Sequence, residues 1–119
     1  MRYLMLIYVD EDKMQAMRDQ IGQDAYTAKW MAYRGDLSKA GSLLGGEALM
    51  PASTATTMRG KDGGGTIATD GPFVETKEAL GGYFVVEAAN LDDAMAWAGK
   101  MPVFQTGGSV EIRPIVDFN

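Results

Sequence analysis

The strongest signals in the hydrophobic pattern are one apolar run and one helical stripe. Residues 3–9 form an unbroken run of apolar, strand-favouring residue types, which predicts a strand with both faces buried. Residues 23–40 carry apolar side chains at helical spacing, which predicts a long helix that ends before Gly41. The stripe on that helix consists of Tyr26, Trp30, Tyr33 and Leu37.

The rest of the pattern alternates short strands with turns and shorter helices. Further strands are predicted at residues 42–49, 54–59, 66–69, 82–88 and 109–116. Shorter helices are predicted at residues 13–20 and 90–101, the latter capped by Asn90, and residues 74–79 predict a charged loop or a helical turn. The strands at 54–59 and 66–69 flank three glycines and predict a β-hairpin. This order predicts one α+β domain over residues 1–119, a ferredoxin-like βαββαβ unit with a β-hairpin inserted after its second strand.

The strands carry more apolar surface than one sheet face requires. Both helices of a ferredoxin-like unit pack on the same face, yet residues 3–9 and 83–86 place apolar side chains on both faces. Large contiguous apolar patches are rare on monomers, so we expect a second copy of the chain to cover the other face. The alternative cover is the N-terminal segment or the hairpin of the same chain.

Composition and charge exclude several classes of function. The net charge of −5 and the pI near 4.6 argue against binding to nucleic acid or to anionic lipid. No apolar stretch approaches the roughly 18 residues of a membrane span, and acids at positions 10–12 interrupt the N-terminal run too early for a secretory signal. The chain has no Cys and no His, which excludes disulfides and zinc sites built on those ligands and suits the cytoplasm. We expect no metal and no cofactor.

An ordered set of motifs makes the sequence specific. The motif Asp70-Gly71-Pro72-Phe73 is followed by Glu75-Thr76-Lys77-Glu78 and Leu80-Gly81-Gly82-Tyr83. Before it stand Gly46-Glu47-Ala48-Leu49 and Ser53-Thr54-Ala55-Thr56-Thr57, and the chain closes with Gly107-Gly108-Ser109-Val110-Glu111-Ile112-Arg113-Pro114. Together these motifs resemble the YCII-related family, in the branch named for its DGPF motif. The resemblance covers nearly the whole chain.

The resemblance implies a fold more clearly than an activity. It implies a dimeric α/β-barrel of two ferredoxin-like halves. Most members are uncharacterised, and some are proposed to be enzymes with a His-Asp pair in the cleft, a mechanism that cannot operate in a chain without His. Members of this branch often accompany extracytoplasmic-function sigma factors, which implies a regulatory or interaction role as the alternative to a small-ligand-binding dimer.

Acid–base chemistry in this chain would depend on carboxylates and tyrosine. Asp70 is either a carboxylate held at a cleft or a brace that accepts hydrogen bonds within its own turn. Glu47 stands among apolar residues, where loss of hydration would favour its protonated form, or else faces outward. Tyr8 either donates a hydrogen bond into the cleft or packs in the core. We expect Asp70 and Glu47 to share one cleft, because the strand that carries Glu47 leads into the hairpin that Asp70 ends.

Four further residues form the predicted ligand-binding set: Arg113, Lys77, Phe73 and Ser109. Arg113 shares a strand face with Ser109 and Glu111, where it would bind a carboxylate or phosphate, or else form a cross-strand ion pair. Lys77 belongs to a charge run and is either an anion ligand or solvated. The sequence thus predicts a dimer that binds a small molecule and leaves open whether it is an enzyme.

Overall fold

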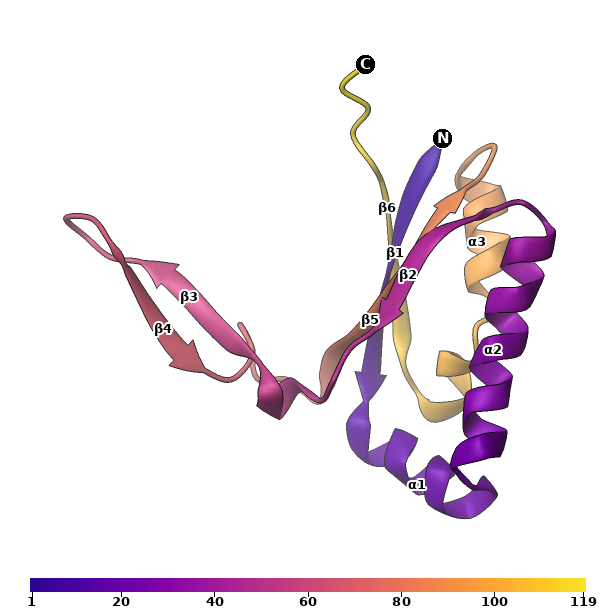
Figure 1. The fold of residues 1–119 in the computed structure, drawn as a ribbon, viewed down its shortest axis with the longest axis horizontal. Helices are drawn as coiled ribbons and strands as arrows, with labels where there is room; N and C mark the ends of the chain where they lie inside the picture. The colour runs from indigo at the N-terminus through magenta and orange to yellow at the C-terminus, as the bar shows by residue number, and fades with distance from the viewer.

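The computed structural model describes residues 1–119 and shows an antiparallel sheet with helices on one face (Figure 1). The sheet has the strand order β2-β5-β1-β6. Its strands are β1 (Arg2–Asp10), β2 (Leu43–Ala48), β5 (Glu78–Glu87) and β6 (Ser109–Pro114). The helices are α1 (Glu11–Ile21), α2 (Gln23–Lys39) and α3 (Leu91–Ala98), with a short 3-10 helix η2 (Pro102–Thr106). This order confirms the predicted α+β fold with ferredoxin-like topology.

The inserted hairpin projects from the sheet as an arm (Figure 1). We call residues 56–70 the arm; its strands β3 (Thr56–Gly60) and β4 (Thr66–Asp70) pair only with each other. The 3-10 helix η1 (Ala52–Thr54) connects β2 to it. The radius of gyration is 16.3 Å, whereas a compact domain of this length would have about 13.5 Å. The arm therefore gains little burial within its own chain.

The core lies between the helices and one face of the sheet. On β1, side chains alternate between the helix layer and the opposite face, here called the open face. The helix-facing side chains Tyr3, Met5, Ile7 and Val9 are buried. The open face carries Leu4, Leu6, Tyr8, Tyr83 and Val85, all only half-buried. The burial predicted for both faces of residues 3–9 is therefore complete on one face only.

Several element boundaries differ from the sequence-based expectation, among them those of β5, α1 and α3. Strand β5 begins at Glu78, so residues 78 and 79 extend a strand where a loop or helical turn was expected, because they pair with Val9 and Asp10 beyond a register shift. The helix expected at residues 13–20 begins earlier, since the Asp10 side chain caps it by accepting from the Lys13 backbone N–H at 3.1 Å. The helix expected to reach residue 101 ends at Ala98.

None of the helices combines the length and apolar character that a membrane span requires.

Tyr33 is the core residue whose ionisation is coupled to folding. Its hydroxyl donates a hydrogen bond to the Trp97 carbonyl at 2.8 Å, and burial raises the pKa of Tyr33 from 10.0 to about 12. The folded state therefore holds this proton more tightly than the unfolded state does. The contribution of Tyr33 to the free energy of unfolding is complete below pH 10 and is lost as the pH rises to about 12. Urea unfolding from pH 10 to pH 12 should show a steeper loss of stability than in Tyr33→Phe. Parallel losses in the two proteins would contradict this.

Candidate functional site

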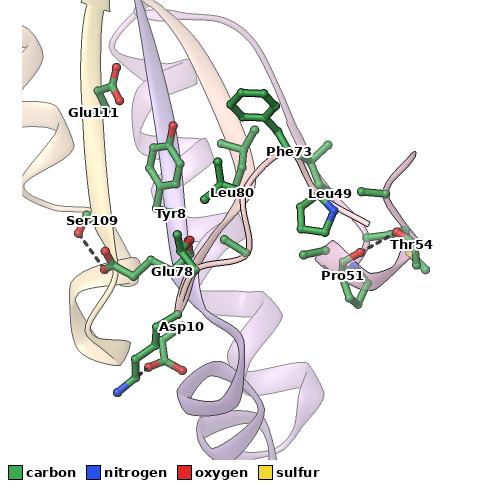
Figure 2. A pocket seen from close by; sticks show the side chains of 18 of the residues that line it. Tyr8, Asp10, Leu49, Pro51, Thr54, Phe73, Glu78, Leu80, Ser109 and Glu111 are labelled. Atoms are coloured by element: carbon green, nitrogen blue, oxygen red, sulfur yellow. Dashed lines mark hydrogen bonds and ion pairs between the residues drawn. The ribbon is translucent and has the colours of Figure 1, made fainter. Parts of the chain in front are cut away.

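A cleft of about 1350 Å³ opens on the open face where the arm joins the sheet (Figure 2). We call it the open-face cleft. One wall is formed by the ends of β1 and β6, and the other by the segments around residues 49–57 and 72–80. The side chains that determine its chemistry are Tyr8, Glu78, Ser109, Glu111, Phe73 and Leu80.

A row of polar side chains crosses three strands at the bottom of the cleft. Tyr8 lies opposite Ser109 of β6 and Leu80 of β5 in the strand register. The Ser109 hydroxyl donates a hydrogen bond to Glu78 Oε1 at 2.9 Å, and Figure 2 shows the Glu78 carboxylate reaching toward Ser109 near the Tyr8 ring. A phenol that can donate and a carboxylate that can accept are thus presented from the floor of one cleft.

Asp10 fixes the lower end of this row. It is only 4% exposed, and Oδ1 accepts the backbone N–H of Lys13 at the start of α1. Its Oδ2 lies 3.9 Å from Lys77 Nζ, and both lysines line the cleft. Because Asp10 is already committed to the helix cap, we assign it a structural role and leave Glu78 as the accessible carboxylate of the row.

The opposite wall mixes apolar and polar side chains, and hydrogen bonds at the base of the arm hold its loop. Gly71 has φ 106°, its N–H donates to the Ala55 carbonyl at 2.7 Å, and its carbonyl accepts from the Thr57 hydroxyl at 2.8 Å. Arg59 donates to the Phe73 carbonyl at 3.0 Å and stacks over the Phe73 ring at 5.3 Å. The ring itself is 72% exposed in a single chain. A large aromatic side chain thus contacts Arg59 while most of its surface stays exposed.

The comparisons with known proteins assign the family. The family model of the YCII-related domain matches residues 1–119. The chain belongs to the YCII-related family. It is 34% identical over 116 residues to the uncharacterized protein R00369 of Rhizobium meliloti (strain 1021), a match that covers 97% of this chain and 92% of that protein. The branch named for the DGPF motif stays a prediction.

A solved structure shares the YCII-related fold. It is 5-chloro-2-hydroxyhydroquinone dehydrochlorinase (TftG) from Burkholderia phenoliruptrix AC1100, in complex with 2,5-dihydroxybenzoquinone. The match has a TM-score of 0.58 and covers 98% of this chain and 94% of that one. The sequences are 17% identical, so the likeness concerns the fold alone.

Four of the candidate site residues from the sequence analysis line the open-face cleft: Tyr8, Phe73, Lys77 and Ser109. Arg113 does not line it and is instead ion-paired with Glu111 of the same strand. The alternative considered for Arg113 was an ion pair across two strands. The structure shows an ion pair, but its partner Glu111 lies in the same strand. Glu111 is the member of that pair that reaches the cleft.

Asp70 and Glu47 do not meet in one cleft of a single chain. Asp70 is exposed at the end of β4, and its carboxylate makes no hydrogen bond. The turn is braced by Thr57 and Arg59, so the structure does not show the bracing role that was one of the two alternatives for Asp70. Glu47 is exposed opposite Tyr83 of β5, so it lacks the loss of hydration considered from the sequence. Their roles as site residues stay predictions that need a second copy of the chain.

Sequence reasoning missed two acidic residues of the cleft. Asp10 enters the sequence analysis only as one of the acids that interrupt the N-terminal run, although an Asp directly before a helix is a typical N-cap signal. Glu78 was read as part of a solvated charge run, and only its register opposite Asp10 places it in the sheet. The first had a local signal, whereas the second depends on pairing between distant segments.

Proposed function

We propose that the chain forms a homodimer that binds a small hydroxylated ring in the open-face cleft. The observation that carries this proposal is the polar row of Tyr8, Glu78 and Ser109 in the same cleft as the apolar side chains of Phe73 and Leu80. Small-molecule sites usually combine an apolar lining with a few placed polar groups. No observation favours the alternative, a regulatory role beside a sigma factor.

The second copy would complete the site. The cleft has a volume of about 1350 Å³. Small-molecule sites usually measure about 300–1,000 Å³, so this cleft is larger than most of them. The open face leaves Leu4, Leu6 and Val85 half-buried, and the arm exposes Met58 and Ile67. A two-fold pairing would use this same surface twice, and the dimer so formed corresponds to the α/β-barrel expected for the family.

The chemistry of the cleft favours a ligand with ring hydroxyl or keto groups. The Tyr8 hydroxyl and Lys77 can donate hydrogen bonds, the Glu78 and Glu111 carboxylates can accept them, and Phe73 offers a ring face. The 2,5-dihydroxybenzoquinone in the neighbour's complex belongs to this class of compound. If the chain is an enzyme, Tyr8 and Glu78 are the pair that would move a proton on such a ring.

The candidate residues outside the cleft could join the site only in a dimer. Asp70, Glu47 and Arg113 would take part only if the second copy presents them at the rim of the first copy's cleft. Asp70 lies at the base of the arm, and Glu47 lies on the open face beside Tyr83. Both positions belong to the surface that the proposed dimer would share.

The polar row predicts the effect of two substitutions on binding. Glu78→Gln removes a charged acceptor and Tyr8→Phe removes the phenol, and each should weaken binding of 2,5-dihydroxybenzoquinone by about tenfold, the worth of roughly one hydrogen bond. Isothermal titration calorimetry measures this. Glu75→Gln is the matched control, because Glu75 lies in the same charge run but is exposed and does not line the cleft. Equal weakening by the control, or none by Glu78→Gln, would refute the assignment.

A further inference from the structure

A second cavity lies on the other side of the sheet, between the helices and strands β2 and β5. We call it the helix-side cavity; its volume is about 360 Å³. This falls within the range of about 300–1,000 Å³ that small-ligand sites occupy. Four aromatic residues are among those that line it: Tyr26, Trp30, Tyr83 and Phe84. The cavity thus has the size and lining for one small aromatic ring.

Arg18 of α1 brings an unpaired guanidinium to the lining of this cavity. Its Nε is inaccessible to solvent and has no hydrogen-bond partner. Its guanidinium lies 5.2 Å from the centre of the Tyr26 ring, and it takes part in none of the chain's ion pairs. Nε is covered by protein atoms, so a ligand in the cavity would meet the Nη N–H groups of Arg18, and these have no acceptor in the chain either.

Arg34 of α2 contributes a second guanidinium to the same cavity. Its Nη1 donates to the Gly46 carbonyl at 3.1 Å, and its guanidinium lies 6.0 Å from the centre of the Phe84 ring. It also forms no ion pair, so its other N–H groups are available to a ligand. Guanidinium groups are suited to carboxylates because their planar N–H pairs match the two carboxylate oxygens.

The charge balance of the cavity favours an anion. Arg18 and Arg34 are the charged residues that the helices bring to this cavity, and the one acidic lining residue, Glu47, is exposed, lies opposite Tyr83 in the register and pairs with neither arginine. The chain as a whole carries a net charge of −5, so this local excess of positive charge runs against the composition. The open-face cleft has the opposite balance, with more carboxylates than ammonium groups among its lining residues.

We propose that the helix-side cavity is a separate binding site for a small aromatic carboxylate. The carboxylate accepts hydrogen bonds from Arg18 and Arg34, and the ring packs among Tyr26, Trp30 and Phe84. An inorganic anion would leave that aromatic surface uncovered, whereas an uncharged ring would leave the guanidinium donors unsatisfied. This site is independent of the function proposed for the open-face cleft, since the two cavities lie on opposite faces of the sheet and share only Leu49.

The probe for this site is benzoate, followed by the fluorescence of Trp30 in a Trp97→Phe background that leaves one tryptophan. We expect a saturable change in fluorescence, and we expect benzyl alcohol, which has the ring without the carboxylate, to bind at least tenfold more weakly. Arg18→Gln and Arg34→Gln should each weaken benzoate binding by about tenfold or more, because each removes a charge-assisted hydrogen bond. Arg2→Gln, at an exposed arginine outside the cavity, should leave the affinity unchanged.

Three outcomes would overturn the proposal. These are the absence of a saturable Trp30 response to benzoate, equal affinity for benzyl alcohol, and benzoate affinity that survives both arginine substitutions. Circular dichroism and thermal melts show whether each variant is folded. If Arg18→Gln does not fold, the Arg34→Gln variant and the comparison with benzyl alcohol decide the matter.

Discussion

A Leu4→Asp variant is expected to be a monomer under conditions in which the unchanged chain is a dimer. Leu4 lies half-buried on the open face, and the proposed interface would bury it completely. A carboxylate there would have to lose its hydration on dimerisation, which costs several kcal/mol when no partner compensates, on the order of the whole interface free energy. Light scattering should report about 12.8 kDa for the variant and about twice that mass for the unchanged chain.

The same substitution should leave the protomer folded. Leu4 is only half-buried in a single chain, so the new carboxylate would keep contact with water as long as no second copy covers it. The matched control is Leu91→Asp, because Leu91 is 49% exposed in the first turn of α3, on the helix side and away from the open face. An acid is well tolerated there. A dimeric Leu4→Asp variant, or a control that also dissociates, would contradict the proposed interface.

A Gly108→Ala variant is expected to lose about 1–3 kcal/mol of unfolding free energy, the usual cost of overpacking. Gly108 lies where η2 meets β6, and a Cβ added there would overlap the Val103 side chain and lie 2.5 Å from the Tyr8 carbonyl oxygen. That oxygen belongs to the backbone of β1, so it can move only together with the strand. The shift would also separate Tyr8 from Ser109, so ligand affinity in the open-face cleft should fall as well.

Gly35→Ala is the matched control for this effect. Gly35 lies inside α2, and an added Cβ would meet no atom within 4 Å. Because Ala favours the helix over Gly, this variant should gain about 0.5–1 kcal/mol. Urea unfolding of the two variants measures both changes, and changes of the same sign would show that the crowding around Gly108 is unimportant.

The fold was predictable wherever the signals were local. The apolar run at residues 3–9, the stripe on α2 and the Asn90 cap each gave the correct element, and the Asn90 side chain does accept from the Asp93 N–H. The start of β5 was not predictable, because Glu78 lies in a charged stretch of sequence that is typical of the surface. Only its pairing with Asp10 in the structure places it in the sheet. An apolar run also cannot reveal which of its two faces the helices will cover.

The site was predictable only in part, for a related reason. Tyr8 and Ser109 lie in the cleft because they pair directly across β1 and β6, and both belong to strands that the pattern predicts. The separation of Asp70 from Glu47 arises from the direction of the arm, which leaves the sheet through η1. No periodicity encodes that direction. The unpaired Nε of Arg18 likewise depends on how α1 packs, which the sequence alone does not show.

Native mass spectrometry with 2,5-dihydroxybenzoquinone tests most directly the claim that two copies enclose a small-molecule site, because one spectrum reports both assembly and ligand. The expected spectrum is a dimer of the 12.8 kDa chain carrying bound ligand, with much less ligand on Glu78→Gln dimers and none on Leu4→Asp monomers. A bare monomer of the unchanged chain, or equal ligand occupancy in the Glu78→Gln and unchanged dimers, would contradict the claim.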